Sequence, residues 1–107
     1  MKKVQLTTHA KKRAKQRMRW NRDVLLKMAE KALNEGYKHS DTKGTVHRYL
    51  TKLWFDHENA TNMRIYGEDI YFFRGSTLIT LYRMPQAIIK KAKYQIDRGE
   101  EENEESE

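Results

Sequence analysis

Hydrophobic positions recur with a helical period through the first half of the chain. Ala10, Ala14 and Met18 return every four residues, which predicts a first helix over about 9–19 with a narrow buried stripe. One of the threonines at 7–8 is expected to cap this helix, because a threonine hydroxyl accepts a hydrogen bond from the free N–H groups of a first turn.

The same period predicts two further helices. Asn21 is suited to cap the second helix and Gly36 to end it. The apolar face of this second helix consists of Val24, Leu25, Met28, Ala29, Ala32 and Leu33. After a polar loop over 38–44, a third and shorter helix is predicted by the apolar positions Val46, Tyr49, Leu50, Leu53 and Trp54.

The pattern changes to a period of two after residue 61. The runs MRIYG, IYFFRG and TLITLYRM are β-branched and aromatic and are separated by turn residues, which is typical of an antiparallel meander. Pro85, the only proline, is expected to end the last strand and to open a final helix through about Ile96.

These elements predict a single domain of the α+β class. We expect the three N-terminal helices on one face of an antiparallel sheet of three or four strands, followed by a short C-terminal helix. The domain is predicted over 1–98 and a disordered acidic tail over 99–107. The expected core consists of Ala14, Met18, Leu25, Met28, Ala32, Leu50, Leu53, Ile65, Phe72, Ile79 and Leu81.

Charge is distributed unevenly along the chain. The net charge is +7, but six of the fifteen acids lie within 99–107, so residues 1–98 carry 22 Lys or Arg against nine acids and a net charge of +13. A body this basic is expected to bind a nucleic acid such as RNA, or an acidic protein, since neutralised phosphates release their condensed counterions.

Other classes of protein are disfavoured. The chain has no cysteine, which excludes a disulfide framework, a thiolate zinc site and a cysteine nucleophile. Its longest apolar runs, IYFF and LITLY, are far shorter than the roughly 18 residues of a membrane span, so we expect a cytoplasmic protein without a membrane partner. The histidines and acids match no metal-ligand spacing, and neither a metal nor a cofactor is predicted.

The first helix concentrates the positive charge. Residues 7–20 hold six Lys or Arg, one His and no acid. His9, Arg13 and Arg17 stand four apart, so each advances about 40° around the helix and about 6 Å along it, and the three form one ridge. Arginine offers a planar fork of donors to a phosphate. The neighbouring lysines supply diffuse attraction to nucleic acid or form an ordinary solvated face; they are Lys11, Lys12 and Lys15.

The predicted strands offer a second set of polar side chains. If alternation holds along each strand, one face is apolar and the other carries Arg64, Tyr66, Thr80 and Tyr82. Tyrosine and threonine are common on the wet side of any sheet. The functional alternative is a surface on which RNA bases stack on tyrosine while arginine holds the backbone.

Several stretches resemble a group of small, mostly uncharacterised proteins of Gram-positive bacteria and their phages. The resemblance rests on HAKKRAKQR, YLTKLWF, RIYG and TLITLYRMP, within roughly residues 7–88. A His-Ala-x-x-Arg-x-x-x-Arg helix followed by strands ending in Thr-x-Tyr is also similar to domains related to the RelE toxins, in the barnase-EndoU-colicin-RelE class of ribonuclease folds. The resemblance implies a site formed by His9, Arg13, Arg17, Arg64, Tyr66, Thr80 and Tyr82.

Metal-independent RNA cleavage needs a base for the 2′-hydroxyl, positive charge at the phosphorane and a proton donor for the leaving 5′-oxygen. His9 could act as base or acid, because imidazole exchanges protons near neutral pH. Arg13 and Arg64 could hold the phosphate, and Tyr66 or Tyr82 could donate a proton or stack on a base.

Three functions stay open on the sequence. A RelE-like endoribonuclease predicts cleavage that a chelator does not stop. A noncatalytic nucleic-acid-binding regulator predicts salt-sensitive binding that leaves the polymer intact. A phage-encoded inhibitor of a host defence protein predicts an acidic or nucleic-acid-binding protein as the partner.

Overall fold

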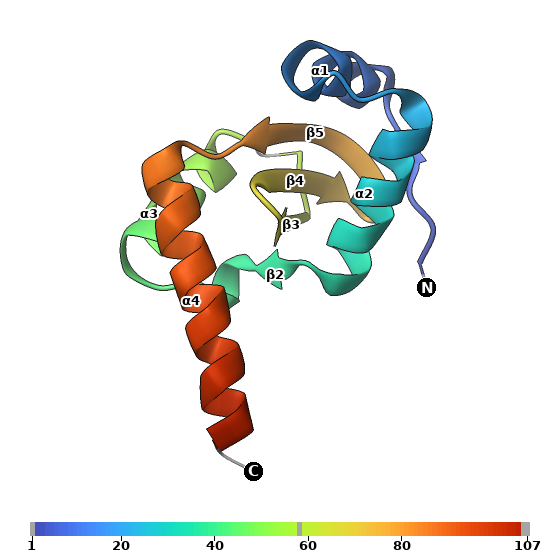
Figure 1. Ribbon diagram of the computed structural model, residues 1–107. Coiled ribbons are helices and arrows are strands. Elements are labelled where there is room, and N and C mark those ends of the chain that lie inside the picture. Colours follow the sequence, from blue (N-terminus) through green and yellow to red (C-terminus); the bar gives the residue numbers. More distant parts are fainter. Residues whose placement is uncertain (1, 58, 106–107) are drawn as a thin grey trace.

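The computed structural model describes residues 2–57 and 59–105, with side chains up to residue 96. The elements, shown in Figure 1, follow in the order β1 (Gln5–Leu6), α1 (Thr8–Met18), α2 (Arg22–Glu35), β2 (Tyr37–Lys38), the short 3-10 helix η1 (His39–Asp41), α3 (Gly44–Phe55), β3 (Asn62–Tyr66), β4 (Asp69–Arg74), β5 (Thr77–Arg83) and α4 (Gln86–Glu105).

The sheet has five strands in the order β1-β5-β4-β3-β2. Strands β2 to β5 pair antiparallel, whereas β1 pairs parallel with β5. The predicted meander of β3, β4 and β5 is therefore present, but the prediction of a purely antiparallel sheet with three or four strands is wrong. β1 and β2 have two residues each, too few to show the alternation that identifies the longer strands.

Glycines open both turns of the meander. Gly67 and Gly75 have φ angles of 63° and 61°, left-handed values that a residue with a Cβ rarely adopts. The first turn has only two residues, because Tyr66 pairs directly with Asp69. Such tight turns fix the register of the strands and hence decide which side chains share a face.

Helices cover both faces of the sheet. α1 and α2 pack on one face, the α1–α2 face, and α3 and α4 pack on the other, the α3–α4 face (Figure 1). The prediction that all three N-terminal helices share one face is therefore wrong for α3. The reason lies in β4, where Tyr71 and Phe73 belong to one core and Ile70 and Phe72 to the other. A strand that is apolar at consecutive positions needs cover on both sides.

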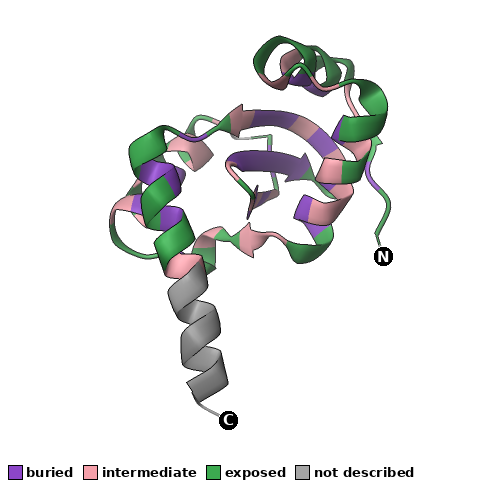
Figure 2. Cartoon of the chain, viewed as in Figure 1, coloured by how far each residue is buried: buried purple, intermediate pink, exposed green. Residues whose placement is uncertain are grey.

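The fold has two hydrophobic cores, one on each face of the sheet, where the sequence predicted a single core. Figure 2 shows that the central strands β4 and β5 are largely buried between them. Among the expected core residues, Ala14, Leu25, Ala32, Leu50, Ile65, Phe72 and Leu81 are buried. The others pack against a core while remaining partly exposed, namely Met18, Met28, Leu53 and Ile79.

The ends of the first two helices agree with the sequence. Thr7 caps α1 and Asn21 caps α2, each by accepting a hydrogen bond from a backbone N–H of the first turn, at 3.0 and 2.9 Å. At the end of α2, a Cβ on Gly36 would lie only 2.4 Å from the carbonyl oxygen of Ala32. Glycine is therefore required where the chain turns from α2 into β2.

The last helix is longer than the sequence predicted. α4 continues beyond Ile96 to Glu105, so the backbone of 99–105 is helical where a disordered acidic tail was expected. Residues 106 and 107, the end of that predicted tail, lie outside the described residues. Glutamate is a good helix former, and adding residues to an existing helix avoids the unfavourable nucleation step.

Candidate nucleic-acid interface

Helix α1 lies along the outer edge of β5. β1 pairs only with the first two residues of β5, and beyond them no strand within the described residues adjoins this edge. The Thr7 hydroxyl donates to the carbonyl oxygens of Leu78 and Ile79, at 3.1 and 3.2 Å. Near the other end of α1, Arg17 Nη1 donates to the carbonyl oxygen of Leu81 at 3.0 Å. Both ends of α1 therefore satisfy edge carbonyls that another strand would otherwise bind.

The lysines of α1 face away from this contact. Ala10 and Ala14 are fully buried against the sheet, whereas Lys11, Lys12 and Lys15 are exposed. Among the residues that the structure describes, no acid forms an ion pair with any cation of α1. The described acids therefore do not neutralise the positive charge of this helix, which is exposed at its lysines.

His9 and Arg13, two members of the predicted ridge, contact each other through their side chains. Arg13 Nε donates to His9 Nε2 across 3.4 Å. The bond requires an unprotonated Nε2 on His9, and it leaves both terminal NH2 groups of Arg13 for a ligand. The prediction that a spacing of four brings these two side chains together is confirmed.

Arg17 extends the ridge onto β5. Its guanidinium carbon lies 4.3 Å from the centre of the Tyr82 ring, which is a cation–π contact. Only one of its five N–H groups is used in the bond to the β5 backbone, so the others can reach a phosphate. Because Arg17 covers one face of the Tyr82 ring, a nucleic-acid base on this side would stack on the guanidinium plane instead.

His57, which was not among the predicted site residues, completes this cluster. Its Nδ1 lies 3.0 Å from the carbonyl oxygen of Leu53, which can only accept, so Nδ1 carries the proton. In the neutral ring, Nε2 then accepts a hydrogen bond from the Tyr82 hydroxyl at 2.9 Å. The imidazole also stacks on Phe72, with 4.4 Å between ring centres. We call these residues the Arg17–Tyr82–His57 cluster.

The sequence carries little sign of this role for His57. The residue lies between α3 and β3 in the stretch DHENATN, whose composition predicts only a polar loop. Its contact with Tyr82 spans 25 positions of the chain and depends on α3 packing on the face of the sheet that carries Tyr82. No local signal specifies that packing.

The four predicted sheet residues do not share a face. Arg64 and Tyr66 lie on the α1–α2 face, and Thr80 and Tyr82 lie on the α3–α4 face, as their cross-strand partners in β4 show. The prediction of one common face is wrong. The cause is an irregularity in the pairing of β4 with β5, where Ile79 has no partner in the register. Such a bulge inserts one extra residue and reverses the alternation on either side of it.

The remaining sheet residues lie apart from the α1 ridge. Thr80 is 2% exposed, and its hydroxyl has no hydrogen-bond partner among the described residues, so it lies below the surface. Tyr66 is half-buried against the core of the α1–α2 face, and Arg64 lines a separate cavity. The structure thus pairs His9 with Arg13 and, further along α1, brings Arg17 together with Tyr82 and His57. Arg64, Tyr66 and Thr80 lie apart from both contacts.

A second polar cluster on the α1–α2 face combines the buried residues Asp69 and Tyr71 with the exposed Arg83. Asp69 is 4% exposed and accepts from Arg83 Nε at 3.3 Å. Burial raises the pKa of Asp69 above its ordinary value, although the hydrogen bond from Arg83 acts in the opposite direction. Burial also raises the pKa of Tyr71, whose hydroxyl has no partner among the described residues. Asp69 directly follows the turn residues Gly67 and Glu68, but it begins β4 and is paired with Arg83.

No protein-family model, curated protein or solved structure matches this chain. Over residues 2–57 and 59–96, whose side chains the structure describes, no three His, Cys, Asp or Glu side chains come together in a way that would hold a metal ion. The same residues contain no helix that is long and apolar enough to span a bilayer. The candidate interface consists of the cations of α1 and the Arg17–Tyr82–His57 cluster.

Proposed function

We propose that this chain is an RNA-binding protein in which α1 is the phosphate-binding element. The observation that carries the proposal is the absence of any acid paired with the cations of α1 among the described residues. Cations of this kind bind backbone phosphates and release counterions, which gives affinity without reading the base sequence. The resemblance to RelE-like domains favours RNA over DNA and a cytoplasmic site of action.

The side chains of α1 have different roles in this proposal. Lys11, Lys12 and Lys15 supply diffuse attraction, because each is an exposed and flexible point charge. Arg13 and Arg17 hold individual phosphates, because each is fixed by one hydrogen bond and retains free donors. The loss of freedom on binding is therefore smaller for the two arginines than for the lysines.

Fluorescence anisotropy of a labelled single-stranded RNA, measured over a range of salt concentrations, tests the binding proposal. A variant with glutamine at Lys11, Lys12 and Lys15 should bind at least about tenfold more weakly at low salt. The matched control removes three exposed lysines from α3 and α4, namely Lys52, Lys90 and Lys91.

The two triple variants lose the same charge, so only the position of that charge differs between them. Equal losses would show that net charge alone attracts RNA and would contradict a role for α1. If the wild-type protein binds no RNA, an acidic protein becomes the expected partner of this surface.

A second function, metal-independent RNA cleavage, is favoured by a separate observation. Tyr82, stacked under Arg17, has its hydroxyl bonded to a histidine nitrogen that is free to accept a proton. Such a pair can relay a proton away from a nucleophile, while the nearby guanidinium stabilises negative charge on phosphorus-bound oxygen.

In the proposed cleavage step, the 2′-hydroxyl proton moves to the Tyr82 oxygen as the Tyr82 proton moves to His57 Nε2. The 2′-oxygen bonds to phosphorus and the bond from phosphorus to the 5′-oxygen breaks. In this step His9 carries a second proton, so its bond with Arg13 is broken, and His9 gives that proton to the 5′-oxygen. Arg13 and Arg17 neutralise the phosphorane. The products are a 2′,3′-cyclic phosphate and a 5′-hydroxyl.

The variant Tyr82→Phe separates binding from cleavage. Phenylalanine keeps the ring beneath Arg17 and removes only the hydroxyl, so RNA affinity should change by less than about twofold while cleavage falls by about a hundredfold or more. Cleavage ends are analysed in the presence of EDTA, and His57→Gln serves as a second test of the relay. Intact RNA after incubation with the wild-type protein would leave a binding protein without nuclease activity.

A further inference from the structure

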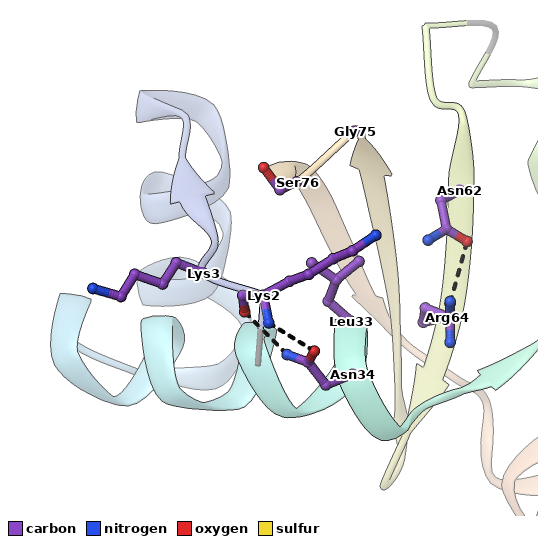
Figure 3. A pocket seen from close by; sticks show the side chains of 8 residues that line it. All are labelled: Lys2, Lys3, Leu33, Asn34, Asn62, Arg64, Gly75 and Ser76. Carbon is purple, nitrogen blue, oxygen red and sulfur yellow. Dashed lines mark hydrogen bonds between the residues drawn. The ribbon is translucent and has the colours of Figure 1, made fainter.

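A second cationic region is hollowed into the α1–α2 face, apart from the α1 ridge. The cavity has a volume of about 640 Å³ and is lined by the N-terminal segment, the end of α2, the start of β3 and the turn before β5 (Figure 3). No acid is among its lining residues. It contains Arg64, one of the residues that the resemblance implied for the site but that the register of the sheet separates from α1.

Arg64 is held in one orientation within this cavity. Its Nε donates to Asn62 Oδ1 at 3.3 Å and its Nη1 to the carbonyl oxygen of Gly36 at 3.1 Å. A Cβ on Gly36 would lie 3.1 Å from the Cβ of Arg64, so the absence of a side chain there allows this close approach. The two bonds use two of the five guanidinium N–H groups and leave three for a ligand.

Lys2 supplies a second cation from the opposite wall. Its backbone is fixed to the Asn34 side chain by two hydrogen bonds, with Lys2 N donating to Oδ1 at 2.9 Å and Nδ2 donating to Lys2 O at 3.0 Å. Figure 3 shows the ammonium group of Lys2 reaching across the cavity, whereas Lys3 points away from it. Both lysines border the cavity, but only the ammonium group of Lys2 is directed into it.

We propose that this cavity binds a phosphomonoester. Arg64 and Lys2 would contact the phosphate oxygens, and the Ser76 hydroxyl and the Asn62 amide would add donors, because Asn62 already uses its oxygen to accept from Arg64. The C-terminal end of α2 lies nearby and carries about half a negative charge, which is less than the two full positive charges. The volume falls within the range of small-ligand sites and leaves space for a group larger than phosphate.

Two sources present this chemistry, a free nucleoside monophosphate and the 5′-phosphate at the end of an RNA strand. No aromatic side chain lines the cavity, so recognition rests on the phosphate and not on stacking with a base. The site is independent of α1. A variant lacking the charges of Lys11, Lys12 and Lys15 should therefore bind a monophosphate as the wild type does.

Titration of the full chain with AMP and with adenosine, followed by amide chemical shifts, tests the proposal. AMP should bind saturably at concentrations up to about 10 mM and adenosine should not, since only AMP carries the phosphate. Arg64→Gln should weaken AMP binding about tenfold, and Arg64→Lys should weaken it nearly as much because the fixed fork is lost. Retained amide dispersion in either variant shows that the fold is intact.

Lys2→Gln and Lys3→Gln form the matched pair, because they remove the same charge from adjacent positions. Lys2→Gln should weaken AMP binding several-fold, and Lys3→Gln by less than about twofold. Equal losses in this pair, equal binding of adenosine and AMP, or no saturable binding of AMP would each overturn the proposal. Tighter binding of a 5′-phosphorylated RNA than of its 5′-hydroxyl form identifies the strand end as the ligand, and equal binding identifies the free nucleotide.

Discussion

Arg17 and Arg83 lie on opposite faces of the same sheet, and only Arg83 is paired with an acid among the described residues. On the α3–α4 face, Arg17 stacks on Tyr82 and donates to a backbone carbonyl, with no acid among its contacts in the described residues. On the α1–α2 face, Arg83 is paired with the buried carboxylate of Asp69. The charge of an arginine that is paired with an acid is balanced within the fold. An arginine held by an aromatic ring and a carbonyl oxygen has no counter-charge there, so its positive charge can attract an anionic ligand.

The comparison shows that the same residue types can have different roles. Whether an acid within the fold balances the arginine's charge is the more informative feature. Each cluster combines an arginine with a tyrosine, and the two tyrosines lie on the neighbouring strands β5 and β4. In the first, the Tyr82 hydroxyl is bonded to His57; in the second, the Tyr71 hydroxyl is buried without a partner among the described residues. Only the first cluster adjoins an exposed helix rich in unpaired cations, and we infer that the second serves the fold.

The largest expected effect tests whether both faces belong to one folding unit. Leu25 and Leu50 are fully buried, one in each core, so replacing either with alanine should lower the free energy of unfolding by about 2 to 5 kcal/mol. Urea denaturation followed by circular dichroism measures both losses. The exposed Lys52→Ala provides the control. Wild-type stability for Leu50→Ala would contradict a core beneath α3, and two separate transitions would contradict a single unit.

The sequence predicted those parts of the fold that depend on local periodicity. The caps at Thr7 and Asn21, the ridge contact between His9 and Arg13, and the meander all follow from patterns within a few residues. The run IYFF also carried information, since consecutive apolar residues need cover on both faces. That signal shows that both faces of the sheet are covered, but it does not show which helix covers which face.

The rest depends on contacts between distant segments. The bulge beside Ile79 decides which face receives Thr80 and Tyr82, and no residue in the run TLITLY marks it. One extra residue separates these side chains from Arg64 and Tyr66, because the alternation of a strand has a period of two. His57 reaches Tyr82 only after α3 is packed, so local patterns predicted the contact between His9 and Arg13 but not the Arg17–Tyr82–His57 cluster.

The second prediction applies one substitution to both clusters. Arg17→Lys and Arg13→Lys keep the charge but lose the planar fork, so each should weaken RNA binding about tenfold, or about 1.4 kcal/mol. Arg83→Lys makes the same chemical change at the acid-paired arginine and should alter RNA affinity by less than about twofold. Anisotropy at one low salt concentration gives all three values. If Arg13→Lys is no worse than Lys12→Ala, α1 is only a solvated cationic face.

The third prediction concerns the buried acid. Burial raises the pKa of Asp69 above its ordinary 3.8, so between these two values the folded protein binds more protons than the unfolded chain. The stability of the wild type relative to Asp69→Asn should therefore be highest below pH 3.8 and fall as the pH rises through the raised pKa. Urea unfolding of both proteins from acid to neutral pH measures this difference. A relative stability that instead rises with pH would show that the Arg83 pair outweighs burial.

The smallest expected effect is the loss of a single exposed lysine, which tests whether RNA is attracted to α1 in particular or to the whole basic surface. Lys12 is exposed on α1, and Lys91 is exposed on α4, so Lys12→Ala and Lys91→Ala remove the same charge from two sites. Lys12→Ala should reduce RNA affinity by less than about 1 kcal/mol and lower the slope of log affinity against log salt by about 0.7 to 1, as expected when one phosphate contact is lost. Lys91→Ala should leave the slope unchanged, because α4 lies outside the proposed interface. A reduced slope for Lys91→Ala as well would mean that RNA binds the whole basic surface, and the contrast between the two faces of the sheet would then have no bearing on RNA binding.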